Sequence, residues 1–316
     1  MTTTSRLNVE GTIVDVTNLK KVLYPNAGFN KGNVIDYYVR ISPVLLPHLK
    51  DRPITLKRYP DGVDGFFFYE KQCPNHRPKW VKTAKIAKSE GGVINYCLMN
   101  DLPALVWAAN LANLELHTFL HKAPAINRPT TLAFDLDPGP PTNIILCCKV
   151  GLWLKAIFDA FGMECFPKTS GSKGLQVYVP LNTAVTYGRT KAVSHAIAQL
   201  LERRFPETVV SKMQKSLRFG KILVDWSQND DHKTTVNVYS LRAKQRPMIS
   251  TPVTWEEVSR ALKKNDEKHL MFESKDVLKR VQKLGDLFAP VLTLKQKLPR
   301  LNEISDAGDR ALNGLD

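Results

Sequence analysis

The chain has 316 residues, of which 43% are hydrophobic and 24% are charged, a composition typical of a globular protein and not of a disordered one. Its 45 Lys and Arg residues exceed its 30 Asp and Glu residues and give a formal charge of +15, which indicates a polyanionic partner unless the basic residues only form a solvated surface. Because there is no apolar run of about 18 residues and no apolar region near the first residue, we expect neither a membrane-spanning helix nor a secretory signal.

The first half of the chain predicts a mixture of helices and strands. Apolar residues at helical spacing predict a helix over residues 31–49, and β-branched residues predict a strand over residues 53–59 that the Pro60-Asp61-Gly62 turn ends. The further predicted elements are a strand over residues 65–71, a helix over 102–114 and an extended segment over 116–120.

The second half continues this mixture. A strand over residues 129–137 must end at Pro138, because proline cannot continue it, and Thr142 or Asn143 caps the helix that follows and reaches Phe161. The remaining predictions are a strand, turn and strand over 165–181, a helix capped by Thr186, strands over 221–226 and 234–239, and charged helices over about the last 65 residues with a loose end after Pro299. Without steady βαβ spacing, this order indicates an α+β fold with an antiparallel or mixed sheet.

The cysteine count bears on the compartment. Five cysteines are an odd number for a disulfide framework, and no CxxC pair supports a zinc ribbon or a dithiol redox site. We therefore expect a cytoplasmic protein, associated with the nucleoid if nucleic acid is its partner. The basic residues are spread along the chain and form no tail, which favours a groove assembled by folding.

Asp135 and Asp137 end the strand predicted over residues 129–137. Since side chains alternate along a strand, both carboxylates point to one face while Phe134 and Leu136 face the core. Two adjacent carboxylates repel each other unless a cation neutralises them, and Mg²⁺ or Mn²⁺ prefers oxygen ligands of this kind. Taken alone, the pair is as typical of an ordinary strand end as of a metal site.

Asp225 is a third acid in the same setting, because it ends the apolar strand predicted over residues 221–226. Two neighbouring strands that bring three carboxylates to one edge would form a two-metal site. In such a site one ion activates an attacking hydroxyl and the other stabilises a leaving pyrophosphate. For Asp225 alone, a salt bridge at a strand end is the alternative.

Residues 168–174, Lys-Thr-Ser-Gly-Ser-Lys-Gly, lie between two predicted strands. Glycines let successive backbone N–H groups point inward, and the hydroxyls and Lys173 add donors for phosphate groups. The segment is not a Walker A motif, because a strand and not a helix follows it. As a bare pattern it is also typical of a hairpin turn, but together with the acids it favours phosphate binding.

Three motifs in this order resemble one family. Residues 135–139 (Asp-Leu-Asp-Pro-Gly), 169–175 (Thr-Ser-Gly-Ser-Lys-Gly-Leu) and 224–229 (Val-Asp-Trp-Ser-Gln-Asn) resemble the polymerase domain of bacterial DNA ligase D, a member of the archaeo-eukaryotic primase superfamily that serves non-homologous end joining. Shorter matches extend the resemblance over about residues 8–300. It implies an α+β primase-like core with antiparallel or mixed, RRM-like sheets and flanking helices. The implied domain is bilobed over residues 1–300, with a DNA-contacting part over about 1–125, a catalytic part over about 126–300 and a tail over 301–316.

The resemblance also implies an activity, that of a template-directed nucleotidyltransferase that fills gaps and extends ends, preferring ribonucleotides. Two Mg²⁺ or Mn²⁺ ions would bind to Asp135, Asp137 and Asp225. The residues that it implies for nucleotide binding are Ser170, Ser172, Lys173, Gln176, Arg218, Gln228, Arg242, His117 and Lys57.

The DNA contacts implied by the resemblance lie in the first 70 residues. Phe68 and Tyr69 match an aromatic pair that stacks on a base, and such stacking is worth about 1–3 kcal/mol per base. Lys21 and Lys31 match a pocket for the 5′-phosphate at a break, and Asn18 and Arg58 are further expected DNA contacts. Without the resemblance, the aromatic run is more typical of a core, isolated lysines of a solvated surface, and His117 of a hydrogen-bonded core histidine.

The sequence departs from the family pattern at two positions. Gln176 stands where the family typically has a histidine that reaches the triphosphate, and glutamine donates a hydrogen bond but carries no charge or proton near neutral pH. A weaker hold on the nucleotide is therefore expected, with the activity retained. Thr118 stands where the family usually has proline, which affects only the local backbone.

The expected partners are gapped or broken DNA with a 5′-phosphate, nucleoside triphosphates, a DNA ligase and a Ku-type end-binding protein. A ligase is expected because the Lys-x-Asp-Gly pattern of a ligase nucleophile is absent. Two other functions stay open at this point. The chain could be a non-catalytic module that bridges DNA ends, although three retained acids argue against a pure phosphate binder, or a primase that uses the same site.

Overall fold

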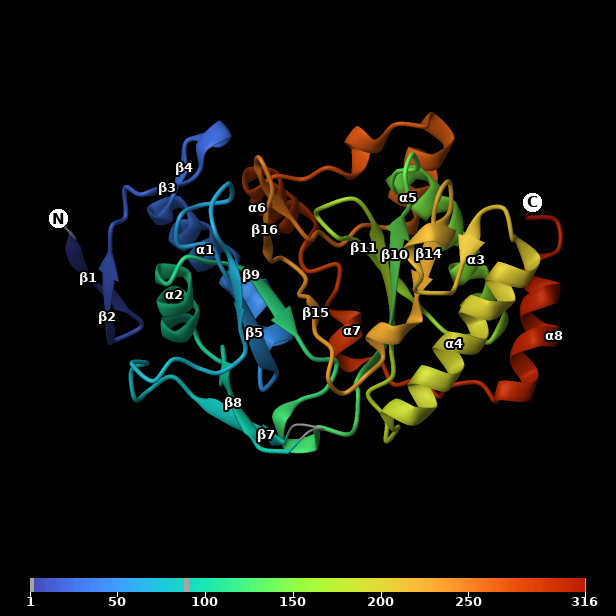
Figure 1. The fold of residues 1–316 in the computed structure, drawn as a ribbon, viewed down its shortest axis with the longest axis horizontal. Helices are drawn as coiled ribbons and strands as arrows, with labels where there is room; N and C mark the ends of the chain where they lie inside the picture. Colours follow the sequence, from blue (N-terminus) through green and yellow to red (C-terminus); the bar gives the residue numbers. More distant parts are fainter. Residues whose placement is uncertain (1–2, 88–90, 316) are drawn as a thin grey trace. The chain divides into compact units, whose positions relative to one another are not determined.

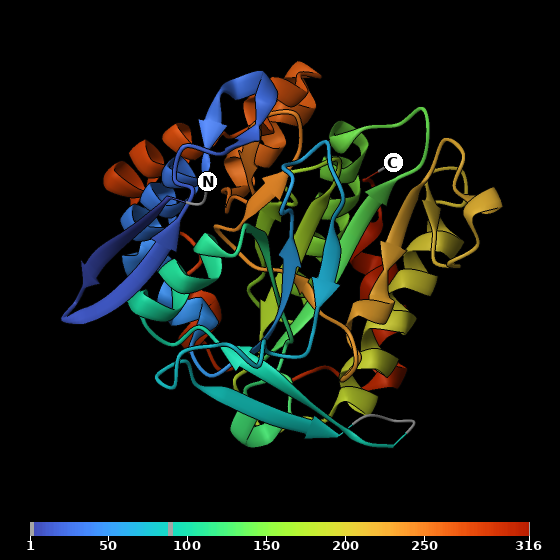
Figure 2. The same cartoon turned by 60° about the vertical axis from the view of Figure 1, so that its left-hand side comes forward.

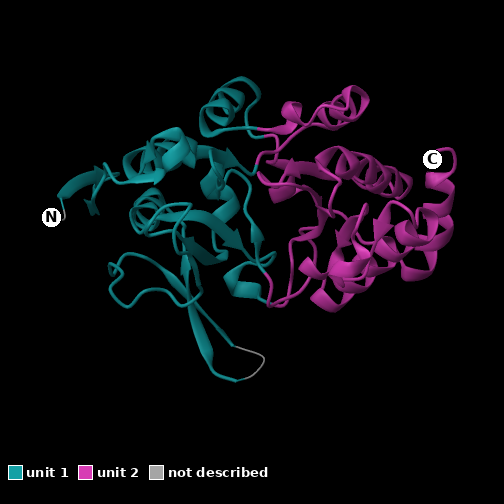
Figure 3. Ribbon diagram, turned by 45° about the horizontal axis from the view of Figure 1, so that its top comes forward, with its two compact units in different colours: residues 1–126, 234–250, 272–286 teal, residues 127–233, 251–271, 287–316 magenta. Residues whose placement is uncertain are grey.

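The structure is a computed structural model that describes residues 3–87 and 91–315, and it mixes helices with antiparallel and mixed sheets, which confirms the α+β class (Figures 1 and 2). The chain divides into two compact units (Figure 3). Unit 1 comprises residues 1–126, 234–250 and 272–286, and unit 2 comprises residues 127–233, 251–271 and 287–316. Each unit is therefore built from segments that are far apart in the sequence.

Unit 1 is built around an antiparallel sheet with helices packed beside it. In spatial order its main sheet consists of β15 (Thr235–Val236), β9 (Asn113–Thr118), β5 (Pro53–Arg58), β8 (Val93–Leu98) and β7 (Thr83–Ala87), and β6 (Phe68–Glu70) pairs with the second half of β5. Its two-stranded sheets are β1 (Thr4–Val9) with β2 (Thr12–Thr17), β3 (Val22–Tyr24) with β4 (Phe29–Asn30), and β16 (Leu241–Ala243) with β17 (Pro247–Ile249). Its α-helices are α1 (Lys31–Leu49), α2 (Leu102–Asn110) and α6 (Ser274–Leu284).

The helix predicted over residues 31–49 is confirmed as α1. Asn30 caps it, because its side chain accepts from the N–H of Asn33 while the Asn33 side chain accepts from Asn30. Tyr38 anchors the buried face by donating to the Leu114 carbonyl at 2.6 Å. The helix predicted over residues 102–114 ends earlier, at Asn110, because Ala112 has a φ of 57° and β9 starts immediately after it.

In the described residues, unit 2 contains a mixed five-stranded sheet with helices beside it. The order is β11 (Phe166–Thr169), β12 (Leu175–Pro180), β10 (Thr131–Pro138), β14 (Ile222–Asp225) and β13 (Val209–Val210); only the β13–β14 pair is parallel. Its α-helices are α3 (Ile144–Ala160), α4 (Tyr187–Arg204), α5 (Trp255–Lys264), α7 (Pro290–Thr293) and α8 (Leu301–Leu312).

The two faces of the unit 2 sheet differ in polarity, as strand alternation predicts. The Phe134 ring lies 5.9 Å from the Phe158 ring of α3, and Leu136 also approaches α3, at Gly151. Asp135 and Asp137 therefore point to the opposite face of β10. The predicted caps of the flanking helices are confirmed, since Asn143 accepts from Ile145 and Thr186 from Arg189 at the starts of α3 and α4.

The end of the chain was expected to be loose after Pro299, and this expectation was wrong. Residues Leu301–Leu312 form α8, which runs beside α4 (Figure 1). Ile304, Gly308 and Leu312 are buried at a spacing of four residues, which is the pattern of one helix face. Gly308 allows the close approach, because a Cβ there would lie 2.2 Å from Cδ2 of Leu200.

The cysteines behave differently from the prediction. Cys73 and Cys97 form a disulfide with their Cα atoms 5.0 Å apart, which an odd count of five did not suggest. The backbone N–H of Cys73 donates to the Asn95 carbonyl and thereby fixes its segment beside β8. Cys147, Cys148 and Cys165 are buried as free thiols. Among the helices that the structure describes, none has the length and apolarity needed to cross a bilayer.

Candidate active site and nucleic-acid interface

A row of polar side chains crosses the unit 2 sheet. In the strand register Lys168 of β11 lies opposite Gln176 of β12, Gln176 lies opposite Asp135 of β10, and Asp135 lies opposite Asp225 of β14. Directly opposed residues of antiparallel strands share a face, so the row lies on the face that α3 does not cover. The structure thus brings two of the predicted acids into one line with Gln176, the residue that stands where the family typically has a histidine.

Asp137 extends this row along β10 and is exposed, two residues beyond Asp135. Burial and the charges of Asp137 and Asp225 together raise the pKa of Asp135 to about 7, against the Gln176 hydrogen bond and the Lys168 charge that lower it. Uncompensated negative charge therefore collects at this point of the sheet. A bound cation is the change that would most favour the ionised form of Asp135.

The donor set of the acids only partly fits a metal site. Both oxygens of Asp225 already accept hydrogen bonds, Oδ1 from the N–H and hydroxyl of Ser227 and Oδ2 from the Gln228 amide at 2.8 Å. In the part of the chain that the structure describes, no set of three or more His, Cys, Asp or Glu side chains is placed to hold a metal ion. Asp135 and Asp137 fit the oxygen chemistry of Mg²⁺ or Mn²⁺, whereas Asp225 would have to turn from Ser227 and Gln228.

The Ser170–Gly174 loop is a compact turn between β11 and β12. The Ser170 hydroxyl accepts from the N–H groups of Ser172 and Gly174, and the Ser170 N–H donates to the Gly174 carbonyl at 2.9 Å. Gly174 is required here, because a Cβ on it would lie 2.2 Å from the Leu136 carbonyl oxygen. This contact holds the loop against β10, while Ser172 and Lys173 remain exposed. The loop can therefore present a hydroxyl and an ammonium group beside Asp137.

Arg218 reaches the same end of β10 from the segment that precedes β14. A Cβ on Gly139 would lie 1.7 Å from the Arg218 carbonyl oxygen, so only glycine permits this approach, and the Gly139 N–H donates to the Lys221 carbonyl. The Arg218 guanidinium bonds to the Met213 carbonyl at 2.5 Å. The amide of Gln228, which was predicted to lie near the triphosphate, donates to Asp225.

Unit 1 gathers another part of the predicted set around Glu115, which is 1% exposed. One carboxylate oxygen lies 2.9 Å from Nε2 of His117 and 3.3 Å from Nε of Arg242, and the other lies 3.6 Å from Nζ of Lys57. Tyr59 and the Ala243 N–H also donate to it. Three residues predicted to bind the nucleotide are thus held by one buried acid.

The pKa values in this cluster follow from the surplus of cations. Burial alone would raise the pKa of Glu115, but the hydrogen bond from His117 and the charges of Arg242 and Lys57 hold it well below its usual range. Burial lowers the pKa of His117, and Arg242 and Lys57 lower it too, against the raising effect of Glu115. The cluster therefore keeps an ionised acid.

The aromatic run at β6 is only partly exposed. Tyr69 is 54% exposed, and so are its neighbours Phe66 and Phe67, at 68% and 46%, whereas Phe68 is half-buried under the Arg58 guanidinium. The Lys57 ammonium lies 4.7 Å from the Phe67 ring centre and 5.2 Å from that of Tyr69. The exposed aromatic surface thus includes two residues that the predicted pair left out.

The predicted 5′-phosphate contacts lie at the start of α1. Lys31 is buried, and burial together with the charges of Lys21 and Arg58 lowers the pKa of its ammonium. Lys21 is more exposed and forms an ion pair with Asp61 at 3.2 Å. Asn18 has a φ of 53°, and its carbonyl accepts from the Lys21 N–H. The Lys31 N–H donates to the Lys21 carbonyl, so the backbone brings the two lysines together.

The predicted residues therefore fall into two groups. Unit 2 holds Asp135, Asp137, Asp225, Ser170, Ser172, Lys173, Gln176, Arg218 and Gln228, and unit 1 holds Lys57, His117, Arg242, Asn18, Lys21, Lys31, Arg58, Phe68 and Tyr69. Sequence reasoning missed Lys168 and Glu115 as site residues. Lys168 is fully buried and its ammonium donates to Oε1 of Gln176 at 2.5 Å. A charged residue within an apolar strand was the available signal for both, since such residues are rarely buried without a partner.

Comparison with known proteins places these motifs in one family. The family model described as "LigD, primase-polymerase domain" matches residues 30–288. The multifunctional non-homologous end joining protein LigD of Mycolicibacterium smegmatis is 37% identical over 299 residues, which cover 93% of this chain and 38% of that protein. The bifunctional non-homologous end joining protein LigD of Bacillus subtilis is 30% identical over 270 residues, which cover 85% of this chain and 42% of that protein. The chain thus spans about two fifths of the length of these curated relatives.

A solved structure is similar over nearly the whole chain. It is the polymerase domain of Mycobacterium tuberculosis ligase D in complex with DNA, with a TM-score of 0.83 and 36% sequence identity. The similarity covers 90% of this chain and 99% of that one. It confirms the predicted fold.

Proposed function

Because the chain belongs to the LigD primase-polymerase family, we propose that it is a template-directed nucleotidyltransferase of non-homologous end-joining repair. It fills gaps and extends ends, preferring ribonucleotides. The observation that carries the proposal is the row Gln176–Asp135–Asp225 with Asp137 beside it, next to a loop of hydroxyl and ammonium donors. Acids whose repulsion calls for a cation, beside donors suited to phosphates, are what nucleotidyl transfer requires.

The proposed step is the attack of a primer 3′-hydroxyl on the α-phosphorus of a nucleoside triphosphate. A new P–O bond forms, the bond to the pyrophosphate breaks, and the hydroxyl proton leaves to an acceptor in the site. Two Mg²⁺ or Mn²⁺ ions bound to Asp135, Asp137 and Asp225 would supply the positive charge that favours this attack.

The remaining residues of unit 2 would hold the triphosphate. The Ser172 hydroxyl and the Lys173 ammonium extend from the loop fixed by Gly174. They would therefore bind phosphate oxygens without a rearrangement of the loop backbone. Arg218 adds a guanidinium from the segment fixed at Gly139. The buried Lys168 orients Gln176, which in turn donates to Asp135 and keeps that carboxylate turned along the row.

Unit 1 would bind the DNA and the base. Exposed Phe66, Phe67 and Tyr69 offer faces for stacking, which tolerates any base. The Glu115 cluster would fix Lys57, His117 and Arg242 for contacts with the nucleotide. The proposed DNA contacts are Lys21 and Lys31 on the 5′-phosphate, with Asn18, Arg58 and Phe68 nearby. The further partners that we propose are a DNA ligase, which seals the strand, and a Ku-type end-binding protein.

The test is nucleotide incorporation on a gapped duplex that carries a 5′-phosphate, with Mn²⁺ and either ribonucleoside or deoxyribonucleoside triphosphates. Wild-type protein is expected to extend the primer by the templated nucleotide, faster with the ribonucleotide. Asp137→Ala is expected to abolish extension. Asp306→Ala, which removes an exposed carboxylate from α8, is the matched control and should extend normally.

Two outcomes would contradict the proposal. If wild-type protein adds no nucleotide, or if Asp137→Ala adds as much as wild type, the catalytic assignment fails. Normal bridging of DNA ends by Asp137→Ala, combined with no synthesis by wild type, would instead support a non-catalytic end-bridging module. Synthesis on an unprimed single strand would identify a primase.

A further inference from the structure

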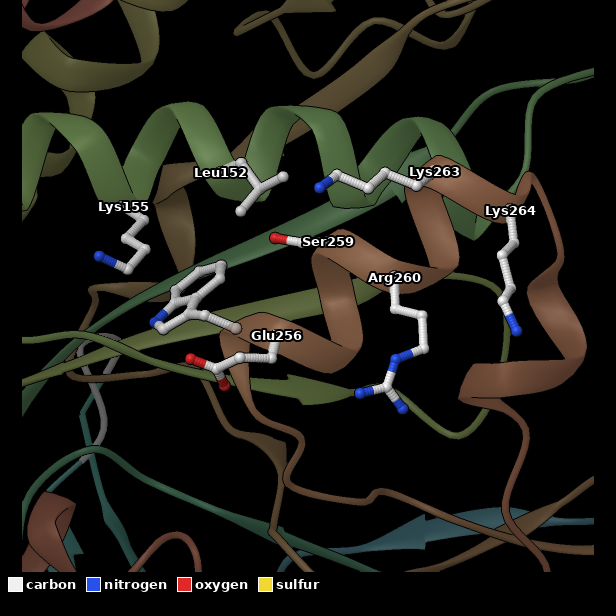
Figure 4. Close-up of a pocket in the computed structure, with 8 residues that line it drawn as sticks. Leu152, Lys155, Glu256, Ser259, Arg260, Lys263 and Lys264 are labelled. Carbon is white, nitrogen blue, oxygen red and sulfur yellow. The ribbon is translucent and has the colours of Figure 1, made fainter.

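A cavity of about 680 Å³ lies on unit 2 between α3 and α5, outside the site described above (Figure 4). Leu152 and Lys155 line it from α3, and Trp255, Arg260, Lys263 and Lys264 line it from α5. Since α3 packs on the side of β10 that carries Phe134, the cavity belongs to the helical side of the sheet, opposite to the face of Asp135 and Asp137. None of these residues takes part in the proposed nucleotidyl transfer.

Four of the eight residues that line the cavity are cationic. Lys263 and Lys264 lie three and four residues after Arg260, so each lies beside it on α5, and Figure 4 shows Arg260 and Lys264 extending in one direction and Lys263 in another. In the described part of the chain these three form no ion pair, although the charge of Arg260 contributes to lowering the pKa of Glu256, and Lys155 pairs with Asp159 at 2.5 Å. Glu256 is the acid among the lining residues. The excess of positive charge points to an anionic ligand.

The position of Lys263 and Lys264 in the last turn of α5 has a structural benefit, because cations there interact favourably with the helix dipole. That benefit does not explain why Arg260 and Lys155, from a different turn and a different helix, line the same cavity. Like charges at a spacing of four residues, as at Arg260 and Lys264, repel each other on a free helix. An anion between them would relieve that repulsion.

Trp255 gives the cavity a fixed aromatic wall. Its indole N–H donates to the Cys165 carbonyl at 2.8 Å, which holds the ring in place. The same residue also lines a second cavity of about 300 Å³, whose walls include the apolar residues Phe166, Pro167 and Val253 and also the acids Asp159 and Glu164. Because both cavities share Lys155, Trp255 and Glu256, they adjoin one another. The acids of the second cavity would repel an anion, so the anionic groups of a ligand would lie on the side of Arg260, Lys263 and Lys264, and an aromatic group would lie at Trp255.

We propose that this cavity binds single-stranded nucleic acid, with Arg260, Lys263 and Lys264 on the phosphates and the Trp255 indole beneath a base. Cations along a groove with an aromatic platform are the features by which proteins bind single strands without sequence preference. The inference rests on the proposed function only in that a strand is present during end joining. Binding at this place requires neither the acids nor synthesis.

The test measures the affinity of the full chain for a fluorescein-labelled oligothymidylate by anisotropy, over a series of NaCl concentrations. The variant R260E/K263E/K264E is expected to lower the slope of log affinity against log salt by about 2, because each phosphate contact on a single strand contributes about 0.7. The matched control is K275E/K279E/K283E, which reverses three exposed lysines on α6 and changes the net charge equally. The control is expected to leave most of that slope intact.

A second pair of variants tests the aromatic wall and does not depend on charge. Trp255→Leu is expected to weaken oligothymidylate binding about tenfold, and Trp255→Phe, which keeps a ring, should bind nearly as wild type. Thermal denaturation of both variants establishes that they are folded. Equal loss in both would overturn the stacking assignment.

Three results would overturn the proposal. The first is a salt slope of R260E/K263E/K264E equal to that of wild type. The second is displacement by thymidine triphosphate, at equal nucleotide concentration, of the part of the oligothymidylate binding that R260E/K263E/K264E removes, which would identify this cavity as a site for free nucleotides. The third is a combined result, in which R260E/K263E/K264E binds the oligothymidylate as wild type does but loses binding of polyglutamate. That result would identify the cavity as a docking site for an acidic protein.

This proposal and the proposed function fail separately. On a gapped duplex without a single-stranded overhang, R260E/K263E/K264E is expected to incorporate nucleotides as wild type does. If this variant lowers the slope of log affinity against log salt but leaves synthesis intact, the result supports the proposed single-strand site between α3 and α5. An inactive wild-type protein would overturn the proposed function alone, since the oligothymidylate measurement needs no catalysis.

Discussion

Each unit centres its polar residues on a carboxylate, but the two carboxylates have opposite surroundings. Glu115 of unit 1 contacts His117 and the cations Arg242 and Lys57, which together hold its pKa well below its usual range. Asp135 of unit 2 has two acids as neighbours, which together with burial raise its pKa to about 7. One acid is therefore fully neutralised within the protein, and the other is not.

The difference indicates different tasks for the two clusters. The Glu115 cluster is electrostatically complete, so it can fix the orientation of Lys57, His117 and Arg242 without a ligand. The Asp135 row is incomplete, so its residues gain stability when a cation arrives. Neutralising the central acid should thus have opposite effects on stability in the two units, and this contrast can be tested.

The largest expected effect is that of Asp135→Asn. Synthesis on the gapped duplex should fall by at least about 10³-fold, as for the loss of a residue at the reacting centre. The free energy of unfolding of the metal-free protein should rise by about 1 kcal/mol, because repulsion from Asp137 and Asp225 disappears. Thermal denaturation measures the second effect, with Asp306→Asn as the control. A destabilised Asp135→Asn protein would break the contrast between the units.

Glu115→Gln should act in the other direction. It leaves the charges of Lys57 and Arg242 in a buried place without their acid, which costs about 3–5 kcal/mol for a buried ion pair. Chemical denaturation should therefore show a large loss of stability, while Glu267→Gln at an exposed position should show none. If Glu115→Gln were as stable as wild type, the cations of unit 1 would not depend on Glu115.

The stability of unit 1 should also fall in acid because of His121. Burial, and secondarily the Arg52 charge, lowers the pKa of His121 to about 4, whereas the unfolded chain has the ordinary value of about 6.5. Protonation in that interval therefore favours the unfolded chain, so the contribution is complete above about pH 6.5 and is lost as the pH falls. Between about pH 7 and pH 5 the loss is about 2 kcal/mol. Hydrogen exchange of unit 1 measures it, and His121→Phe should flatten the curve; an unchanged curve would contradict the assignment.

The smallest expected effect concerns Gln176. Gln176→Leu removes the hydrogen bond to Asp135 and the acceptor of the buried Lys168 ammonium, so nucleotide incorporation should fall about tenfold, the equivalent of one hydrogen bond. Gln176→His, which restores a ring nitrogen, should incorporate at a rate close to that of wild type. The ratio of the two rates measures how far unit 2 depends on the row. Equal rates in both variants would show that position 176 does not act on Asp135.

Much of the fold could be predicted from local pattern. The start and end of α1 and the caps Asn143 and Thr186 were predictable because capping and helical periodicity are properties of neighbouring residues. The short pairs β1–β2, β7–β8 and β16–β17 were not predicted. Whether these strands form depends on pairing with a second strand, and the sequence of one strand alone does not indicate which segment that is.

The site shows the same division. Alternation along β10 predicted that Asp135 and Asp137 share a face, but the register that sets Asp225 and Gln176 beside Asp135 depends on two other strands, β14 and β12. Glu115 and Lys168 were missed for this reason, since the partners of a buried charge become visible only when the strands are paired. The Cys73–Cys97 bond was missed likewise, because a count carries no distances.

The packing of α8 shows that the compact unit extends beyond the residues that the family model matches. The family match ends at residue 288, yet Gly308 of α8 lies directly on Leu200 of α4, and the β1–β2 hairpin before residue 30 is joined to α2 by the bond from the Thr17 N–H to Asn110. A protein trimmed to the matched residues would expose the apolar side of α4 to water. The ends of a shortened protein that still folds should therefore be chosen from these packing contacts and not from the limits of the family match.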